Sequence, residues 1–257
     1  MWSDIVDLHE FYRSRLGQVA RRLIRQRIRE LWPDVRGMTV LGVGYATPYL
    51  RPFLDEAARV ASLAPAAQGV MTWPSGEPGL VALADETELP FADLSVDRLL
   101  MIHSAEYSEQ LRGMMREAWR VLSGNGRLLV VAPNRRGIWA RLDRTPIGHG
   151  RPYSPGQLKR MLRESLFTPL HTEHALYLPP TQRRVLLHSA NAFEQIGNRY
   201  FNAISGVVLV EATKQIYAAT PTAKMVQRRG LITLPSRGET VNGRSNAPSG
   251  ANLRMSD

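Results

Sequence analysis

Side chains that could bind and deprotonate an anionic compound gather in residues 135–153. This segment contains five arginines, a histidine and a tyrosine. A guanidinium donates paired hydrogen bonds to a carboxylate or a phosphate, and an imidazole or a phenol can take a proton from a nitrogen or oxygen nucleophile. We therefore expect a substrate site made of Arg135, Arg136, His149 and Tyr153. Either His149 or Tyr153 would be its catalytic residue.

Structural roles compete with that interpretation. The arginines can pair with acidic side chains, and the glycines of the segment can form a rigid Ω-type loop. Residues 153–155, Tyr-Ser-Pro, also have the pattern of a helix N-cap, in which the serine hydroxyl accepts from the first turn and proline follows. The sequence leaves both interpretations open.

A second candidate site is a glycine-containing loop. An apolar run at residues 38–43 predicts a strand, and the loop Gly42-Val43-Gly44-Tyr45-Ala46-Thr47 ends it. Glycines at such a place let the backbone approach a ligand and turn tightly into the next helix. Ligands of open α/β sheets bind beyond the carboxyl ends of the strands, so this loop predicts a binding crevice.

The elements that would position these candidate residues are strands and helices that alternate along the chain. The expected strands are residues 38–43, 60–63, 80–83, 96–102, 128–132, 170–178 and 206–217. The expected helices are residues 4–32, as one helix or two, 47–59, 111–122, 157–165 and 190–204. This alternation predicts an α/β fold with a doubly wound, mostly parallel sheet.

The segment of residues 111–134 carries the most specific pattern. Apolar residues recur at helical spacing up to Leu122, and Gly124 follows, where a left-handed C-cap would need no Cβ. Residues 128–132 are uninterruptedly apolar, as in a strand covered on both faces, and Pro133 ends the run.

This pattern resembles the class I S-adenosylmethionine-dependent methyltransferases, specifically their type 11 group, over roughly residues 35–217. The residues that match the motif R-E-x-x-R-V-L are Arg116, Glu117, Arg120, Val121 and Leu122. The resemblance implies a Rossmann-like sheet of seven strands, the last of them antiparallel. It also implies S-adenosyl-L-methionine as the cofactor and methyl transfer to an unknown substrate.

The resemblance further implies a set of cofactor-binding residues, namely Gly42, Gly44, Ala46, Asp85, Glu86 and His103. Asp85 opens the segment D-E-T-E-L-P-F, similar to the family's D-A-x-x-L-P-F, in which the aspartate accepts from the adenine amino group. His103 follows the fourth expected strand and would line the pocket. The competing roles are structural: a loop aspartate can cap a turn, and a histidine at a strand end can serve packing alone.

Two positions depart from the family pattern. The carboxylate that precedes the glycine loop in the family is Val40 here, and the carboxylate that binds the ribose hydroxyls is Ala64. Hydrogen bonds to a charged group contribute about 1.5–3 kcal/mol each, so we expect this chain to bind the cofactor weakly for its family.

Composition limits the remaining possibilities. The 257 residues carry a formal charge of +10, which favours an anionic partner such as RNA, lipid head groups or an acidic metabolite, or simply gives a solvated basic surface. The absence of cysteine excludes disulfides and thiolate metal sites. No metal site and no membrane span are expected, and a cytoplasmic location is expected because the N-terminus lacks an apolar signal core.

We expect a helical extension at residues 1–36, a methyltransferase-like domain at residues 37–217, and a disordered basic tail at residues 218–257. The basic helical segment 4–32 could lie on a membrane or RNA, but packing across the domain is favoured. Three functions remain open. They are an S-adenosylmethionine-dependent methyltransferase, a catalytically inactive binding or regulatory protein of the same fold, and an RNA methyltransferase, in which case a nucleic acid would be the partner.

Overall fold

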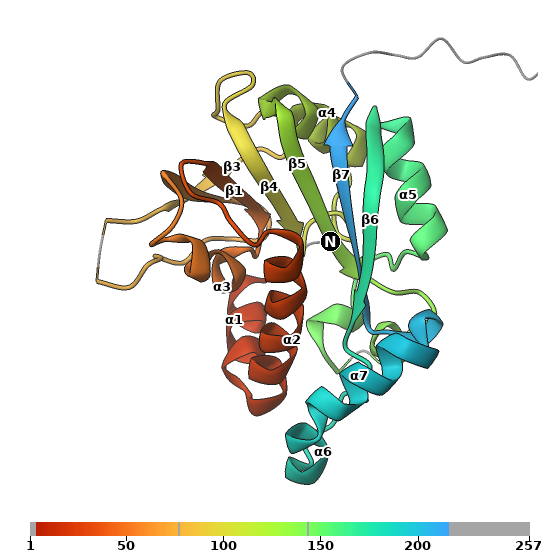
Figure 1. Ribbon diagram of the computed structural model, residues 1–257. Coiled ribbons are helices and arrows are strands. Elements are labelled where there is room, and N and C mark those ends of the chain that lie inside the picture. Colours follow the sequence, from red (N-terminus) through yellow and green to blue (C-terminus); the bar gives the residue numbers. More distant parts are fainter. Residues whose placement is uncertain (1–3, 77, 143, 216–257) are drawn as a thin grey trace, which may run out of the picture. The chain divides into compact units, whose positions relative to one another are not determined.

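A computed structural model describes residues 4–76, 78–142 and 144–215 of the chain. Its centre is a seven-stranded sheet in the order β3-β2-β1-β4-β5-β7-β6 (Figure 1). The strands are β1 (Thr39–Gly44), β2 (Arg59–Pro65), β3 (Val81–Ala84), β4 (Val96–Ile102), β5 (Leu122–Pro133), β6 (Phe167–Ala175) and β7 (Val207–Lys214). β7 pairs antiparallel with both of its neighbours, β5 and β6, and the other strand pairs of the described sheet are parallel. The expected Rossmann-like sheet is therefore confirmed.

Helices cover both faces of this sheet. They are α1 (Ile5–Arg13), α2 (Arg15–Leu31), α3 (Thr47–Leu50), α4 (Leu111–Val121), α5 (Pro155–Glu164), α6 (Arg184–His188) and α7 (Ala190–Tyr200). One core joins α1, α2 and α3 to the sheet, and a second core joins α4 and α5 to its other face. Successive strand residues point to opposite faces, so Leu100 and Leu99 belong to different cores.

The N-terminal helices pack into the first core. The apolar stripe of α2, which includes Leu16, Leu23 and Ile28, is buried. Trp32 follows the helix, and its indole Nε1 donates to Glu211 Oε1 of β7 at 3.0 Å. The interpretation that this segment packs across the domain is confirmed for its apolar side, whereas its arginines remain at the surface. The proposed domain limits at residues 36 and 217 stay predictions, and the tail lies outside the described residues.

Three expected elements differ from the structure. The helix expected at 47–59 ends at Leu50 and continues as a short 3-10 turn at Arg51–Phe53, because Pro52 cannot donate a helical hydrogen bond. Gly124 is not a left-handed cap, since α4 passes directly into β5, whose Leu122 pairs with Val96.

The sixth strand also starts earlier than expected, at Phe167 instead of residue 170. Its register shifts between Pro169 and His171, because proline interrupts the ladder. The strand ends at Ala175, before Leu176, whose positive φ of 66° is incompatible with an extended strand.

The N-cap pattern of residues 153–155 is real and provides a first test of the fold. Ser154 Oγ accepts from Gln157 N at 3.2 Å, and Gln157 Oε1 accepts from Ser154 N at 2.9 Å, a reciprocal capping box.

We expect Ser154→Ala to lower the free energy of unfolding by about 1 kcal/mol, measured by urea denaturation. Ser189 precedes α7 without a side-chain cap bond, so Ser189→Ala is the control. Equal losses in both variants would contradict the capping role.

Candidate cofactor crevice

A cavity of about 620 Å³ opens at the carboxyl ends of β1 and β2. Gly44, Ser62 and Ala64 line it from these strand ends. The opposite wall comes from α1 and α2, and residues 70–75 close a third side. The crevice expected from the glycine loop therefore exists at the expected end of the sheet.

Gly44 fixes the shape of the loop beside the cavity. Its φ of +87° lies in the left-handed region that favours glycine. A Cβ built there would lie 2.3 Å from the carbonyl oxygen of Ile102 and 2.8 Å from that of His103. The glycine is required because the β1 end passes directly over the end of β4.

The other expected cofactor residues lie elsewhere. Gly42 packs on Ala46, whose side chain would be 2.4 Å from a Cβ at Gly42. Among Gly42, Gly44, Ala46, Asp85, Glu86 and His103, only Gly44 is part of the cavity wall. The cofactor-binding role of the other five residues stays a prediction.

Both carboxylates expected to bind the cofactor, Asp85 and Glu86, accept hydrogen bonds through one oxygen from groups of the protein itself. Asp85 Oδ1 accepts from the backbone N and from Oγ1 of Thr87, both at 2.7 Å, and these bonds lower the pKa of Asp85. Glu86 is buried, and its Oε1 accepts from Ser108 Oγ and from the backbone N of Gln110. The turn-capping alternative for Asp85 is what the structure shows.

The two positions that lack the family's acids have different surroundings. Val40 is fully buried in the first core. Ala64 lines the cavity, and so does Ser62, whose buried Oγ has no hydrogen-bond partner among the described residues. A buried hydroxyl without a partner is uncommon, so Ser62 is a candidate for contacting a ligand in the cavity.

The ionisable side chains of Arg and His type that line the cavity are basic, and no acidic side chain lines it among the described residues. Its wall includes Arg13, Arg21, Arg25 and Arg51, together with His9, and no carboxylate among the described residues. None of these four arginines forms an ion pair within the part of the chain that the structure describes. Unpaired guanidinium groups create a positive potential in a cleft, so the cavity favours negatively charged groups.

A buried hydrogen-bond chain lies next to the crevice at the end of β4. Tyr49 donates its hydroxyl to Tyr12 at 2.8 Å, and the Tyr12 hydroxyl lies 2.6 Å from His103 Nε2. Because the Tyr12 oxygen accepts from Tyr49, its own proton is directed to Nε2. The proton of the neutral imidazole is then on Nδ1, which lies 3.6 Å from Glu106 Oε1.

Burial shifts the pKa values of His103 and Glu106 in opposite directions. Desolvation lowers the pKa of His103 to about 3 and raises the pKa of Glu106 to about 7. His103 also has a positive φ of 50°, a strained conformation for a residue with a Cβ. A histidine with so low a pKa is a poor proton acceptor near neutral pH, so its observed role is to hold Tyr12 against the sheet.

Sequence reasoning did not find Tyr12 and Glu106. Tyr12 comes from a helix 91 residues before His103, and no spacing rule relates the two. Glu106 had a weak signal, because it is an acid directly after an apolar strand end, within H-S-A-E-Y.

The four residues expected to bind the substrate do not line this cavity. Two of them are neighbours, since Arg135 N donates to the Tyr153 carbonyl at 3.0 Å. Arg135 is exposed and its Nε donates to the Pro152 carbonyl at 3.3 Å. Arg136 and His149 are also exposed. The Tyr153 hydroxyl donates to the Ala105 carbonyl at 3.1 Å, and burial raises the pKa of this tyrosine. Their substrate and catalytic roles stay predictions.

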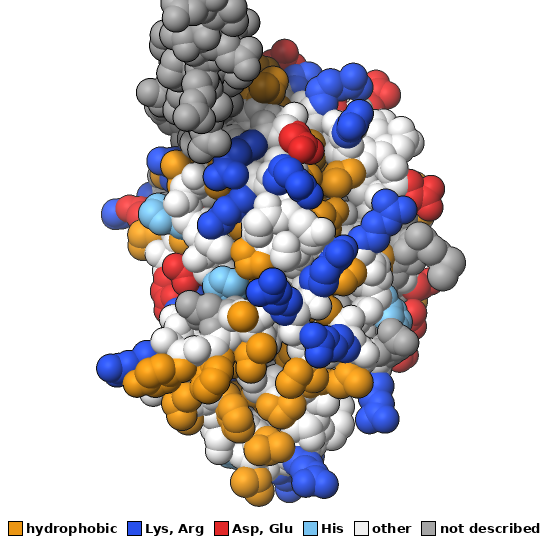
Figure 2. Space-filling view, turned by 90° about the vertical axis from the view of Figure 1, so that its right-hand side faces the viewer, with side chains coloured by type: hydrophobic (Ala, Val, Ile, Leu, Met, Phe, Trp, Pro, Cys, Tyr) orange, Lys and Arg blue, Asp and Glu red, His pale blue; other side chains and the backbone are white. Residues whose placement is uncertain are grey.

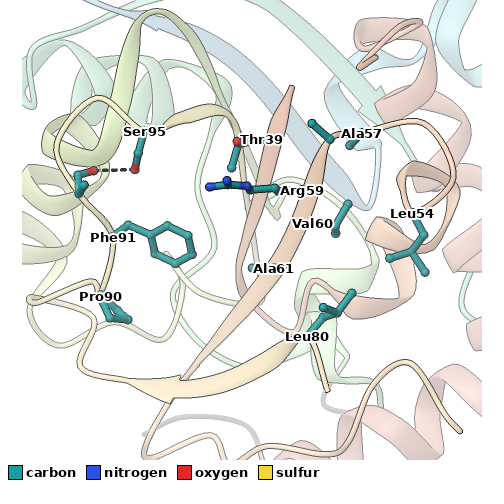
Figure 3. A pocket seen from close by; sticks show the side chains of 12 residues that line it. Thr39, Leu54, Ala57, Arg59, Val60, Ala61, Leu80, Pro90, Phe91 and Ser95 are labelled. Atoms are coloured by element: carbon teal, nitrogen blue, oxygen red, sulfur yellow. Dashed lines mark hydrogen bonds between the residues drawn. The ribbon is translucent and has the colours of Figure 1, made fainter. Parts of the chain in front are cut away.

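A further hollow of about 650 Å³ lies at the amino end of the sheet (Figure 3). Arg59 and Thr39, the first residues of β2 and β1, border it, and Phe91 and Leu80 face it from loops. Its wall is mostly apolar, with Arg59 as the charged exception among the described lining residues. It therefore offers no acid–base pair for catalysis.

Neither a metal-binding group nor a membrane-spanning helix is found among the described residues. Within residues 4–76, 78–142 and 144–215, no group of three histidine, aspartate or glutamate side chains is placed to hold a metal ion. No helix in those ranges has the length and apolarity needed to cross a membrane.

Comparison with known proteins identifies the fold and the domain. Residues 40–130 match the model of a family described as methyltransferase domain. No protein of curated function matches the chain in sequence. The three solved structures described next are 16% to 21% identical to it in sequence, so they establish the fold alone.

These three structures illustrate the degree of similarity in fold and sequence. A methyltransferase from Haloferax volcanii, in complex with the Trm112 activator, has a TM-score of 0.54 at 16% identity and covers 77% of this chain and 93% of its own. A SAM-dependent methyltransferase from Archaeoglobus fulgidus has the same TM-score and identity, with 76% and 94% covered. The cyclase SpnF has a TM-score of 0.54 at 21% identity, with 78% and 83% covered. The resemblance to class I methyltransferases is confirmed.

Proposed function

We propose that this chain, which carries a methyltransferase domain over residues 40–130 and the class I methyltransferase fold, transfers a methyl group to an acceptor that is itself anionic. The family's cofactor, S-adenosylmethionine, supplies a methyl group already activated on a sulfonium sulfur. The protein then has to place the acceptor in line with that methyl group, since orientation provides most of the rate.

The 620 Å³ crevice is the observation that supports this proposal most directly. Backbone groups at Gly44 and the partnerless hydroxyl of Ser62 are available for polar groups of the cofactor. One of the arginines that line the cavity, such as Arg21, suits the carboxylate of its amino acid end. The crevice thus fits the cofactor in place and in polar partners, although it lacks both acids of the family.

The basic wall leads to a sharp prediction about affinity. S-adenosylmethionine carries a positive sulfonium, whereas its product S-adenosylhomocysteine has a neutral sulfur. Four unpaired arginines repel the sulfonium without a compensating carboxylate. We expect the product to bind about tenfold more tightly than the cofactor, measured by isothermal titration calorimetry at low ionic strength.

The control for this experiment is salt. Screening shortens the range of the arginine field, so the difference between the two ligands should shrink at 0.5–1 M NaCl while both still bind. Equal affinities at low salt would contradict the charge argument. Failure of both ligands to bind at millimolar concentration would favour the alternative that this chain is a catalytically inactive binding protein of the same fold.

The acceptor site that we propose remains the segment 135–153, with Arg135, Arg136, His149 and Tyr153. Its support is position, because the segment leaves β5 at its carboxyl end and is tied to the end of β4. Arg151 N donates to the Glu106 carbonyl at 2.8 Å, and Tyr153 N donates to the Pro133 carbonyl at 2.9 Å. Exposed arginines on an anchored loop suit a small acid or a phosphate, and an RNA acceptor would use the same groups.

A further inference from the structure

The helices α6 and α7 present an apolar stripe to solvent. Five of the thirteen exposed large hydrophobic side chains of the described residues fall between positions 185 and 204. Val185, Ile196 and Tyr200 are 78%, 56% and 67% exposed, and Phe201 and Ile204 continue the patch. Ile196 and Tyr200 are four residues apart, which places them on one side of α7, and Val185 lies on the preceding helix α6.

Figures 1 and 2 show where this apolar surface lies on the molecule. Figure 1 shows α6 and α7 below the sheet, beside the lower end of α2. Figure 2 shows hydrophobic side chains gathered over the lower part of the face turned toward the viewer, with lysine and arginine side chains above them. Contiguous exposed apolar patches on soluble domains mark interaction sites.

A basic groove borders the apolar stripe. It has a volume of about 740 Å³ and lies between α2 and α6, where Arg15, Arg21, Arg22, Arg25, Arg184 and His188 line it. No carboxylate lines this groove among the described residues, and none of its five arginines forms an ion pair there. The groove thus has a positive field with no internal partner.

Acidic side chains are also scarce in the sequence around the stripe. Between residues 176 and 206 the one acid is Glu194, against Arg183, Arg184 and Arg199. Glu194 is buried, and its Oε1 accepts from the backbone N of Tyr177 at 2.8 Å. This carboxyl therefore faces the interior, and the exposed side chains of α6 and α7 are apolar, basic or uncharged polar, with no carboxylate among them.

We propose that α6, α7 and the adjacent arginine groove dock this protein on the surface of an anionic phospholipid bilayer. The apolar stripe would enter the boundary between head groups and acyl chains, as interfacial helices do. Arg15, Arg22 and Arg184, the arginines of the groove that do not also line the crevice, would contact the lipid phosphates beside it. A nucleic acid would account for the arginines, but it offers no reason for exposed valine, isoleucine and phenylalanine at the same place.

The test is sedimentation of the full chain with vesicles. We expect binding to vesicles of phosphatidylcholine with 30% phosphatidylglycerol, weaker binding to phosphatidylcholine alone, and a decrease with added NaCl. Each arginine near an anionic surface contributes about 1 kcal/mol, so Arg22→Gln with Arg184→Gln should weaken binding to anionic vesicles by at least about tenfold. Ile196→Ser with Tyr200→Ser should do the same through lost apolar insertion.

Matched controls come from other surfaces of the chain. Leu83 is exposed on β3, at the opposite edge of the sheet, and Arg163 is exposed on α5. Leu83→Ser and Arg163→Gln should leave vesicle binding unchanged, and thermal melting should show that every variant is folded.

Three outcomes would overturn the proposal. The first is absence of vesicle binding by the parent chain, and the second is equal binding to anionic and neutral vesicles. The third is binding of a single-stranded RNA that the arginine variant loses and the Ile196/Tyr200 variant retains, without vesicle binding. None of these outcomes depends on whether the crevice binds S-adenosylmethionine, which calorimetry tests separately.

Discussion

Ala64→Asp is expected to raise the affinity for S-adenosylmethionine by about 10- to 100-fold. Ala64 lines the crevice at the carboxyl end of β2 and is the position where the family has its ribose-binding acid. A carboxylate there would accept charge-assisted hydrogen bonds from a diol, at about 1.5–3 kcal/mol. It would also offset the field of the four arginines across the cavity.

The measurement is calorimetric titration of parent and variant with S-adenosylmethionine under identical salt. Ala64→Asn is the matched control, because it has almost the same shape without the charge, and it should gain little. Val40→Asp would also introduce an acid that the family has, but it is not expected to help. Val40 is fully buried, and an unpaired carboxylate there would destabilise the fold. A folded Ala64→Asp variant with unchanged affinity would show that the ligand does not bind in this crevice.

Glu106→Gln is expected to change how stability depends on pH. Burial raises the pKa of Glu106 from 4.5 to about 7 in the folded protein. The folded-state pKa is above the unfolded one, so this stabilisation is complete below pH 4.5 and is lost as the pH rises through 7. Linkage gives a loss of about 2 kcal/mol between pH 5.5 and pH 8.

His103 acts in the opposite direction over part of this range. Its pKa is lowered to about 3 by burial, so its contribution is present above pH 6.5 and is lost as the pH falls. Because both proteins keep His103, the difference between parent and Glu106→Gln isolates the carboxyl group.

Urea denaturation at several pH values measures this difference. We expect the glutamine variant to gain about 2 kcal/mol relative to the parent as the pH rises from 5.5 to 8. The control is Ser104→Ala, a neighbouring buried residue that does not titrate, which should shift stability by the same amount at every pH. A pH-independent difference for Glu106→Gln would mean that this carboxyl is ionised in the folded protein throughout.

The local patterns of this sequence determined much of the fold. Strand β4 has the limits expected from the sequence, Val96–Ile102, and its apolar second half, Leu99–Ile102, is buried as in a strand covered on both faces. The capping box at Ser154 and the glycine at position 44 were also readable, since each depends on backbone chemistry within a few residues. The mostly parallel sheet followed from the alternation of helix and strand, and its antiparallel seventh strand followed from the family resemblance.

Contacts between residues far apart in the sequence could not be predicted from local patterns and depend on the tertiary structure. The strand pairing of Leu122 with Val96 replaced the cap expected at Gly124, and the contact between Tyr12 and His103 joins segments 91 residues apart. Asp85 and Glu86 matched a motif, yet nearby hydroxyl and backbone donors engage both carboxylates. The basic wall of the crevice arises because α1, α2 and the 3-10 turn at Arg51–Phe53 bring their arginines around one cavity, an arrangement that depends on packing across the whole domain.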